Sequence, residues 1–313
     1  MAARTDAELE IVTAEAVLRG TLRLPRRSRA LPALVVAHGA RLGLRDARVY
    51  VELAEIMGDE GIAVLRYDRR GEGASTGDGD TATPDVLAAD LGAWVRLLQE
   101  HPEIDGSRVG VWGISQGGWL MALAAASDPS IACVVAVSAP GAGPTAQMEY
   151  AVSANMRAAG YDEPAVRAAL AARRVVNQWE DGFIEGPAAQ AALDALRGQP
   201  WFEMAYLGDL SEHLREVDAT WSHLDVRPAL AAVSAPVLLF YGDRDRWVDP
   251  VESPTLWRHA LPNSDVTVVR LAGAGHMPTL AADPDSIDPD ESGPTHPEYV
   301  ARLRTWARSV LLA

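Results

Sequence analysis

Short runs of consecutive apolar residues alternate along this chain with longer stretches in which apolar residues recur every three or four positions. The runs lie at 33–37, 63–67, 109–112, 131–137, 237–241 and 266–271, and the stretches of helical period at 47–59, 85–100, 116–126, 254–260 and 297–312. Continuous hydrophobicity is typical of strands covered on both faces, and intervening helices indicate parallel crossovers. The pattern therefore predicts an α/β fold with a mostly parallel sheet flanked by helices. Apolar and β-branched residues that alternate around Gly20, within 10–24, predict an opening antiparallel hairpin.

The alternation of strand and helix breaks between Pro140 and Ser234. Helical patterns there cover 163–176, 187–196 and 207–217, without a convincing strand. We therefore expect an α/β core formed by residues 1–140 and 233–313, with a helical cap inserted at 141–232. Such a cap is expected over the carboxyl ends of the strands, where open α/β sheets bind ligands.

Charge and cysteine content exclude several classes of chemistry. The chain of 313 residues has a formal charge of −15, and all 28 of its basic residues are arginine. Without lysine, neither a Schiff base, a pyridoxal phosphate anchor nor a P-loop is available. The single cysteine, Cys133, cannot form an intrachain disulfide and is expected to be buried in its apolar run.

The acidic balance and the apolar runs also bear on partners and location. A pI near 4.9 argues against nucleic acid as a partner, because phosphate binding needs a concentrated basic face. No apolar run approaches the length of a membrane span, and the first residues carry no apolar segment of a secretory signal. We therefore expect a cytoplasmic protein that does not bind membranes. Its oligomeric state stays open, a homodimer included.

The strongest chemical pattern is Gly113-Ile-Ser115-Gln-Gly117, which lies between an apolar run and a stretch of helical period. A serine at a sharp strand-to-helix turn is strained, and larger side chains two residues away on either side would collide with neighbouring backbone. Such a turn exposes the serine hydroxyl and directs the first N–H groups of the helix at an adjacent oxygen. Ser115 is thus predicted to be a nucleophile. The alternative interpretation is a glycine-rich helix start that the serine merely caps.

A serine nucleophile needs a base and a group that orients the base. His276 follows the last apolar run on a glycine-containing loop and is the predicted base, with His296 as the rival. The predicted acid is Asp245, which lies on the loop after 237–241 with room to turn back toward the histidine. Asp243 and Asp249 are the alternatives on the same loop.

The oxyanion of a tetrahedral intermediate needs two converging backbone N–H groups. Gln116 is predicted to supply one. The other is assigned to Ala40, on the loop after 33–37, with Arg41 as the near alternative. His38 is expected to brace this loop.

Taken in chain order, these residues resemble the α/β-hydrolase family over most of the chain: the turn at His38-Gly39, the Ser115 elbow, the Asp245 loop and the His276 loop. The segment 67–76, Tyr-Asp-Arg-Arg-Gly-Glu-Gly-Ala-Ser-Thr, is similar to a loop of the esterase, thioesterase and serine-peptidase branches. The resemblance implies an α/β-hydrolase fold and acyl-enzyme chemistry without a cofactor or metal. Ser115 would attack, His276 would carry the proton, and water would release the acid. The chain lacks the HGGG run of hormone-sensitive-lipase-like enzymes, and a serine at the elbow argues against haloalkane dehalogenation.

The predicted function is hydrolysis of a small or medium carboxylic ester, with a small-molecule acyl substrate as partner. A thioesterase, a serine aminopeptidase, an acyltransferase or cyclase, and a non-catalytic binding protein are the alternatives. In the aminopeptidase, a cap carboxylate would clamp the substrate amine, and the candidates are Glu149, Glu180, Glu185 and Glu203. Four tryptophans are candidates for an apolar pocket, namely Trp179, Trp201, Trp221 and Trp247. The acidic run 283–291, just after His276, is expected to disfavour anionic substrates.

Overall fold

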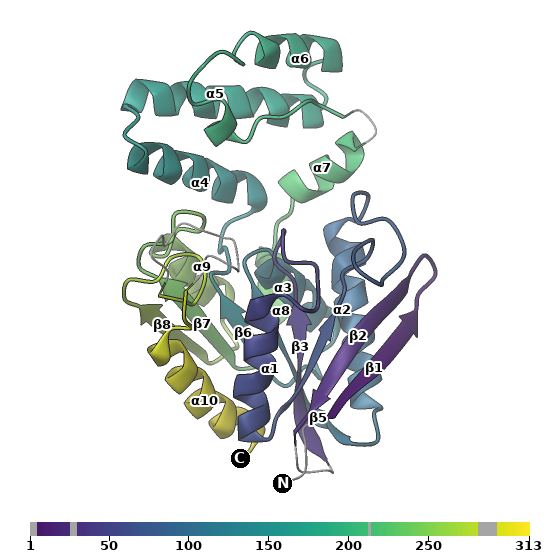
Figure 1. Cartoon of the computed structure of the whole chain (residues 1–313). Coiled ribbons are helices and arrows are strands. Elements are labelled where there is room, and N and C mark those ends of the chain that lie inside the picture. The colour runs from purple at the N-terminus through teal and green to yellow at the C-terminus, as the bar shows by residue number, and fades with distance from the viewer. Residues whose placement is uncertain (1–4, 26–29, 212–213, 281–292) are drawn as a thin grey trace.

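A single mixed sheet forms the centre of the molecule (Figure 1). The computed structural model describes residues 5–25, 30–211, 214–280 and 293–313. In these residues the sheet has eight strands in the order β1-β2-β4-β3-β5-β6-β7-β8. The strands are β1 (Thr5–Val12), β2 (Val17–Leu24), β3 (Leu31–Ala37), β4 (Ala63–Tyr67), β5 (Ile104–Ile114), β6 (Val134–Val137), β7 (Val237–Gly242) and β8 (Val266–Leu271). Only the β1/β2 and β2/β4 pairs are antiparallel, so the prediction of a mostly parallel sheet is confirmed.

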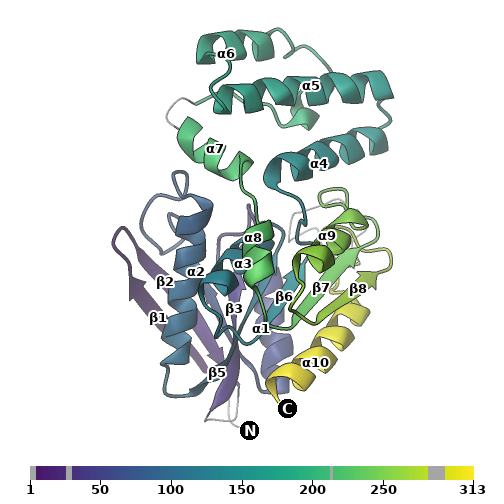
Figure 2. The same ribbon diagram turned by 180° about the vertical axis from the view of Figure 1, so that it is seen from behind.

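Helices cover both faces of the sheet. On one face lie α1 (Arg48–Glu60) and α10 (Pro297–Leu311), and on the other lie α2 (Pro84–Gln99), α3 (Gly117–Ser127), α8 (Arg227–Ala232) and α9 (Glu252–Ala260) (Figures 1 and 2). The fully buried strand β3 shows why its sequence is continuously apolar. Leu34 and Val36 pack toward α1 and α10, whereas Ala33, Val35 and Ala37 pack toward α2 and α3.

The opening hairpin differs in detail from its prediction. β1 begins at Thr5 and pairs with β2 through a turn at residues 13–16, so the hairpin starts five residues earlier than expected. Gly20 lies inside β2 and pairs with both Leu9 and Tyr67. A side chain at Gly20 would lie 3.1 Å from the backbone of β4 and from Trp94, so this glycine marks a close approach of strands.

A second layer of helices lies above the carboxyl ends of the strands (Figures 1 and 2). It contains α4 (Pro144–Ala158), α5 (Glu163–Glu180), α6 (Gly186–Asp194), the 3₁₀ turn η1 (Glu203–Ala205) and α7 (Arg215–Ser222). The elements from α4 to η1 share their own apolar cluster, which includes Val152, Val166, Leu193 and Trp201. We call this layer the cap. Its expected boundaries, 141 and 232, stay a prediction, and α8, at the end of that range, packs against α3 of the core.

Sequence periodicity misplaced part of the cap. The helix expected over 207–217 is wrong: residues 207–211 are not helical, and α7 begins only at Arg215. Leu207 and Leu210 nonetheless pack in or against the apolar cluster of the cap, which explains their helix-like spacing. The helix α4 was not predicted, although Pro144 after Gly143 is a typical first residue of a helix.

Two further expectations concern the core and the membrane. Cys133 is buried, as predicted, and burial raises the pKa of its thiol to about 12. Trp112 and Trp119, on either side of the Ser115 turn, are also buried. Among the helices that the structure describes, none has the length and apolar character to cross a membrane.

Candidate active site

Ser115 occupies the turn between β5 and α3 in a left-handed backbone conformation, with φ of 54°. A non-glycine residue in this region is strained by contact between its Cβ and its own backbone. The two flanking glycines are required by their surroundings. A Cβ on Gly117 would lie 2.5 Å from the carbonyl oxygen of Ala37, and one on Gly113 would lie 2.9 Å from the Met121 side chain. The spacing of glycines around the serine is therefore dictated by the tight passage from strand to helix.

His276 and Asp245 form a buried pair. Nδ1 of His276 lies 2.9 Å from Oδ2 and 3.1 Å from Oδ1 of Asp245. Because a carboxylate only accepts hydrogen bonds, Nδ1 carries the proton and Nε2 is left as the basic nitrogen. Oδ1 of Asp245 also accepts hydrogen bonds from the backbone N–H groups of Trp247 (2.8 Å) and Val248 (2.9 Å). The carboxylate is thus fixed from two sides while it orients the imidazole, and Ser115 and His276 line the same pocket.

The rival residues take structural positions. Asp243 accepts the N–H of Gly273 (2.7 Å), and Asp249 accepts the N–H groups of Val251 and Glu252 at the start of α9. His296 caps α10, since its Nδ1 accepts the N–H of Glu298 (3.1 Å) and its Nε2 donates to the carbonyl of Ala272 (3.2 Å). Both ring nitrogens of His296 are therefore engaged with backbone.

The acid loop and the histidine loop are held together at the end of β7. The backbone at Gly242 passes so close to the carbonyls of Ala274 and Gly275 that a side chain there would overlap them. Ser138, at the end of β6, donates its hydroxyl to the carbonyl of His276 (2.8 Å) and is itself in the left-handed region, with φ of 47°. These contacts fix where the imidazole leaves the backbone.

The cap helix α4 also anchors the acid loop. The Tyr150 hydroxyl donates to the carbonyl of Asp245 (2.9 Å), and Nε2 of Gln147 donates to the carbonyl of Trp247 (2.7 Å). A weaker hydrogen bond runs from Asn155 to the carbonyl of Arg246 (3.3 Å). One face of the cap helix therefore binds three successive carbonyls of the loop that carries Asp245.

The backbone N–H groups of Gln116, Ala40 and Arg41 make no hydrogen bond to any described residue, so all three are available to an oxygen of a bound molecule. Gln116 immediately precedes the first turn of α3. His38, just before this loop, donates from Nε2 to the carbonyl of Tyr67 (2.7 Å). Burial lowers the pKa of His38 to about 3, so it is a neutral bracing residue.

The segment 67–76 supports the loop that carries Ala40. The Asp68 carboxylate accepts backbone N–H groups on both sides, from Arg45 and from Ala74, at 2.9 Å each. Arg69 donates its backbone N–H to the carbonyl of Gly43 (2.7 Å) and its guanidinium to the carbonyl of Ala40 (3.1 Å). In this structure the segment acts as a scaffold for the neighbouring loop.

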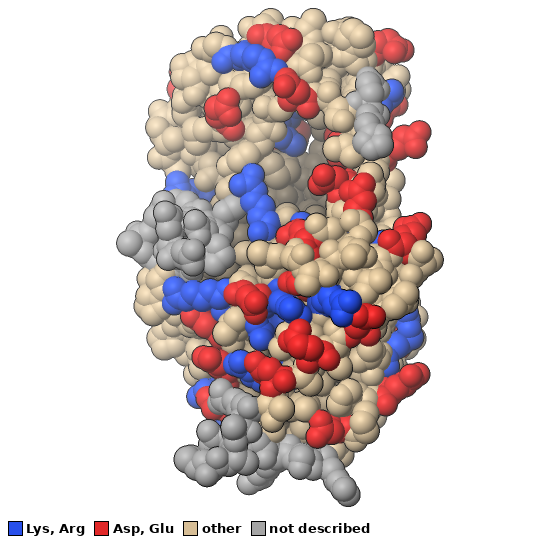
Figure 3. Space-filling model, turned by 45° about the vertical axis from the view of Figure 1, so that its right-hand side comes forward, with Lys and Arg blue, Asp and Glu red and all other residues tan. Residues whose placement is uncertain are grey.

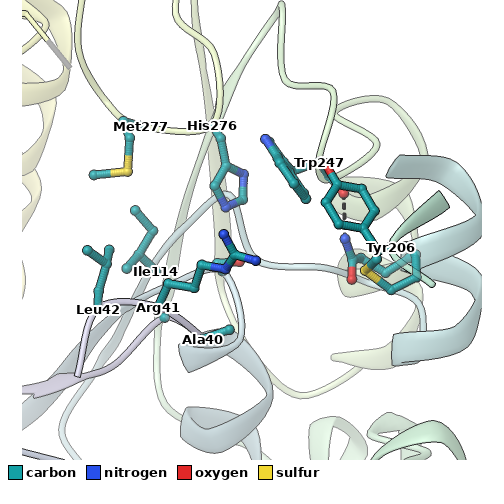
Figure 4. A pocket seen from close by; sticks show the side chains of 12 residues that line it. Ala40, Arg41, Leu42, Ile114, Tyr206, Trp247, His276 and Met277 are labelled. Carbon is teal, nitrogen blue, oxygen red and sulfur yellow. Dashed lines mark hydrogen bonds between the residues drawn. The ribbon is translucent and has the colours of Figure 1, made fainter. Parts of the chain in front are cut away.

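A pocket of about 270 Å³ opens between the cap and the core (Figure 4). The molecular surface is hollowed where the two layers meet (Figure 3). The pocket is lined by Gly39, Ala40, Arg41, Leu42, Ile114, Ser115, Gln147, Met148, Tyr206, Trp247, His276 and Met277. Of the four candidate tryptophans only Trp247 belongs to this lining. Trp179 and Trp201 are buried inside the cap, and Trp221 donates to the carbonyl of Ala82.

Sequence analysis missed the contribution of α4 and of Tyr206 to the pocket. Gln147 and Met148 belong to the unpredicted helix, whose start at Gly143-Pro144 was the available signal. Nothing in the local sequence singles out Tyr206 or Ser138. Within residues 5–25, 30–211, 214–280 and 293–313, no cluster of histidine, cysteine or carboxylate side chains could hold a metal ion. The acidic run 283–291 lies outside the described residues.

Comparison with known proteins agrees with this architecture. Residues 34–287 match the Alpha/beta hydrolase family. Among curated proteins, the chain is 32% identical to thiohydrolase aneE of Aspergillus aculeatus over 136 residues, which cover 43% of this chain and 42% of the relative. It is 31% identical to polyketide transferase grgF of a Penicillium species over 134 residues, 42% of this chain and 44% of the relative. The chain thus spans less than half the length of these relatives.

A solved structure extends the likeness over the whole fold. The structure of DcsB in complex with its substrate analogue superposes with a TM-score of 0.65 at 18% identity, and covers 99% of this chain and 100% of the other. At this identity the likeness concerns the fold alone. The family match over most of the sequence, together with this sheet, shows that the chain belongs to the alpha/beta hydrolase family.

Proposed function

We propose that the protein is a serine hydrolase that cleaves a carboxylic ester through a covalent acyl-enzyme. The observation that carries this proposal is the convergence of the Ser115 elbow and the buried His276–Asp245 pair on one pocket. A hydroxyl is a poor nucleophile at neutral pH, and an oriented neutral imidazole is the group that activates it.

In the proposed reaction, Oγ of Ser115 attacks the ester carbonyl carbon while Nε2 of His276 takes the hydroxyl proton. The Asp245 carboxylate stabilises the imidazolium that forms. The carbonyl oxygen becomes an oxyanion, which the N–H groups of Gln116 and of Ala40 or Arg41 stabilise. The intermediate then expels the alcohol, which takes the proton from His276. Water attacks the acyl-enzyme by the same route, releases the carboxylic acid and restores the Ser115 hydroxyl.

The pocket favours a small or medium acyl group. Its volume of about 270 Å³ lies just below the range of about 300–1,000 Å³ that is typical of ligand pockets. Leu42, Ile114, Met148, Trp247 and Met277 give it mostly apolar walls. Short apolar chains gain free energy in such surroundings by leaving water.

Thioester hydrolysis is the second candidate, and the similarity to a thiohydrolase favours it. The same residues would serve, because a thiolate leaves more readily than an alkoxide. The similarity to a polyketide transferase supports acyl transfer to a nucleophile other than water. The aminopeptidase alternative loses support, since none of Glu149, Glu180, Glu185 and Glu203 lines the described pocket.

The test is replacement of the nucleophile. Ser115→Ala should lower the rate of p-nitrophenyl butyrate hydrolysis at least about 10³-fold while the thermal unfolding midpoint stays near that of the native protein. Ser309→Ala is the matched control, because Ser309 is exposed on α10, away from the pocket. A fluorophosphonate probe should label the native protein and the control but not Ser115→Ala.

Two results would contradict the proposal. Retained hydrolysis by Ser115→Ala would remove Ser115 as the nucleophile. A folded native protein that neither reacts with the probe nor cleaves any ester or thioester would favour the binding-protein alternative. A panel of oxygen esters and thioesters with identical acyl chains then decides which leaving group the site prefers.

A further inference from the structure

The described lining of the candidate pocket has a charge opposite to that of the chain. Acidic residues outnumber basic ones by 43 to 28 in the whole sequence, yet none of the described residues that line the pocket carries a carboxylate. Among the described lining residues, the guanidinium of Arg41 is the one group with a permanent charge. The described part of the pocket therefore presents one permanent positive charge, and its other lining residues are apolar or carry no permanent charge.

The Arg41 guanidinium is not committed to another protein group. Arg41 is exposed, and no described residue forms an ion pair or a side-chain hydrogen bond with it. Figure 4 shows the Arg41 side chain extending among the other side chains that line the pocket. The loop beneath it is fixed, since Arg69 holds the carbonyl of Ala40. The backbone that carries Arg41 is thus braced, while its guanidinium has no partner among the described residues.

Tyr206 lines the same pocket and is held in place by the cap. Its backbone is left-handed, with φ of 52° and ψ of 45°, a conformation that is unfavourable for a large side chain. Arg173 donates to the carbonyls of Ala205 (3.0 Å) and Tyr206 (3.4 Å), which stabilises this turn. The Tyr206 ring packs against Trp247 with their centroids 5.3 Å apart.

The hydroxyl of Tyr206 is a second uncommitted donor. No described residue accepts from it or donates to it, although its ring lines the pocket. Burial raises the pKa of this hydroxyl, and the positive charge of Arg41, which lines the same pocket, opposes the rise. A strained and tethered tyrosine therefore shares one region of the pocket with a free guanidinium.

We propose that Arg41 and Tyr206 bind a carboxylate that the substrate carries in addition to its scissile ester or thioester bond. This inference rests on the proposed function. A guanidinium offers parallel N–H donors that match the two oxygens of a carboxylate, and the phenol supplies a further donor. One cation balances a monoanion, whereas a phosphate dianion would leave uncompensated charge in the apolar surroundings. The expectation that 283–291 disfavours anions concerns residues outside those described, and the described lining favours them.

Two matched pairs of substrates test the proposal. In the first, p-nitrophenyl esters carry a six-carbon acyl chain that ends in a carboxylate or in a carboxamide. In the second, butyrate esters of 4-hydroxybenzoate and 4-hydroxybenzamide place the same difference on the leaving group. The measured quantity is the ratio of kcat/KM for the carboxylate to that for the amide. This ratio should exceed one for the native protein in at least one pair.

In that pair, Arg41→Gln should lower the ratio about ten- to hundred-fold, as expected for loss of a hydrogen bond to a charged group. Arg41→Lys should restore part of it, because the charge returns without the planar fork. Tyr206→Phe should lower the ratio by a smaller factor. Arg258→Gln is the charge control, since Arg258 is exposed on α9 and absent from the pocket, and it should leave the ratio unchanged.

The outcomes separate this proposal from the proposed function. If the carboxamide-bearing esters are cleaved as well as the carboxylate-bearing ones, or if a preference for carboxylate survives in Arg41→Gln, the proposal of carboxylate binding is overturned. The proposed serine hydrolase activity would be unaffected by either result. Failure to cleave any substrate, together with failure of the fluorophosphonate to label Ser115, would instead overturn the proposed function. Calorimetric titration of Ser115→Ala with the monoamide of a six-carbon dicarboxylic acid gives a readout that needs no turnover. Binding that Arg41→Gln abolishes would support the carboxylate site, and absence of binding would count against it.

Discussion

Replacing Asp245 by asparagine tests the proposed role of this residue with almost no change in shape. The native carboxylate accepts hydrogen bonds from the backbone N–H groups of Trp247 and Val248 on one side and faces Nδ1 of His276 on the other. An asparagine that keeps the backbone hydrogen bonds must turn its NH₂ group toward Nδ1. The imidazole then has to accept at Nδ1 and carry its proton on Nε2, where it cannot take a proton from Ser115.

The expected loss follows from this change of tautomer. In a serine protease with the same arrangement, the corresponding substitution lowers kcat about 10⁴-fold. At about 1.4 kcal/mol per tenfold change, this equals about 5 kcal/mol of transition-state stabilisation. We therefore expect Asp245→Asn to lower kcat for p-nitrophenyl butyrate at pH 8 by about 10³- to 10⁴-fold.

Asp243→Asn is the matched control on the same loop. Asp243 is exposed and accepts a single N–H, from Gly273, which an asparagine oxygen can accept equally well. Its kcat should fall less than about tenfold, and the thermal midpoints of both variants show whether the fold is retained. An Asp243→Asn defect as large as that of Asp245→Asn would refute the reasoning. So would a folded Asp245→Asn protein that keeps more than a tenth of the activity.

Two further predictions concern buried groups beside the site. Ser138→Ala and Ser138→Gly both remove the hydrogen bond to the carbonyl of His276, but only the alanine keeps a side chain in the left-handed region. The free energy of unfolding of Ser138→Ala should therefore be about 1 kcal/mol lower than that of Ser138→Gly, in which the strain is relieved. Chemical denaturation measures this difference, and equal stabilities of the two variants would contradict the strain argument. Both variants should also have a lower kcat than the native protein, because the histidine loop is less constrained. For His38, the folded pKa of about 3 lies below the unfolded value of about 6.5, so its contribution to stability is complete above about pH 6.5 and is lost as the pH falls toward 3. At pH 4.5 this loss amounts to about 3 kcal/mol. Urea unfolding between pH 4.5 and 7.5 should show this loss of stability in the native protein but not in His38→Gln. Parallel curves of unfolding free energy against pH would show that His38 does not cause the pH dependence.

Local patterns predicted the core of this fold because each pattern reflects a burial requirement. A strand covered on both faces must be apolar at every position, and β3 meets this condition with all seven of its residues buried. The elbow was predictable for a similar reason. A Cβ at position 117 would have no room beside the carbonyl of Ala37, so this turn requires a glycine that is visible in the sequence.

The cap was harder to predict because its helices are short and pack against one another. Leu207 and Leu210 have helical spacing, yet they reach the apolar cluster of the cap from a segment that is not helical. The start of α4 depends on Gly143 and Pro144, a weaker pattern than the long apolar runs of the core.

By itself, the sequence determined the residue types available for chemistry, their order along the chain and the strand ends at which they lie. It excluded lysine chemistry outright, since the chain has no lysine. Only the tertiary structure decided which of the three aspartates faces His276, because Asp243, Asp245 and Asp249 differ in hydrogen-bond partners rather than in local pattern. It also determined which residues line the pocket, such as Arg41 and Tyr206, which are too far apart in the sequence for a periodic pattern to connect them. Contacts between residues of the cap and residues of the core depend on how these two layers pack together, and the local pattern of apolar residues does not determine that packing.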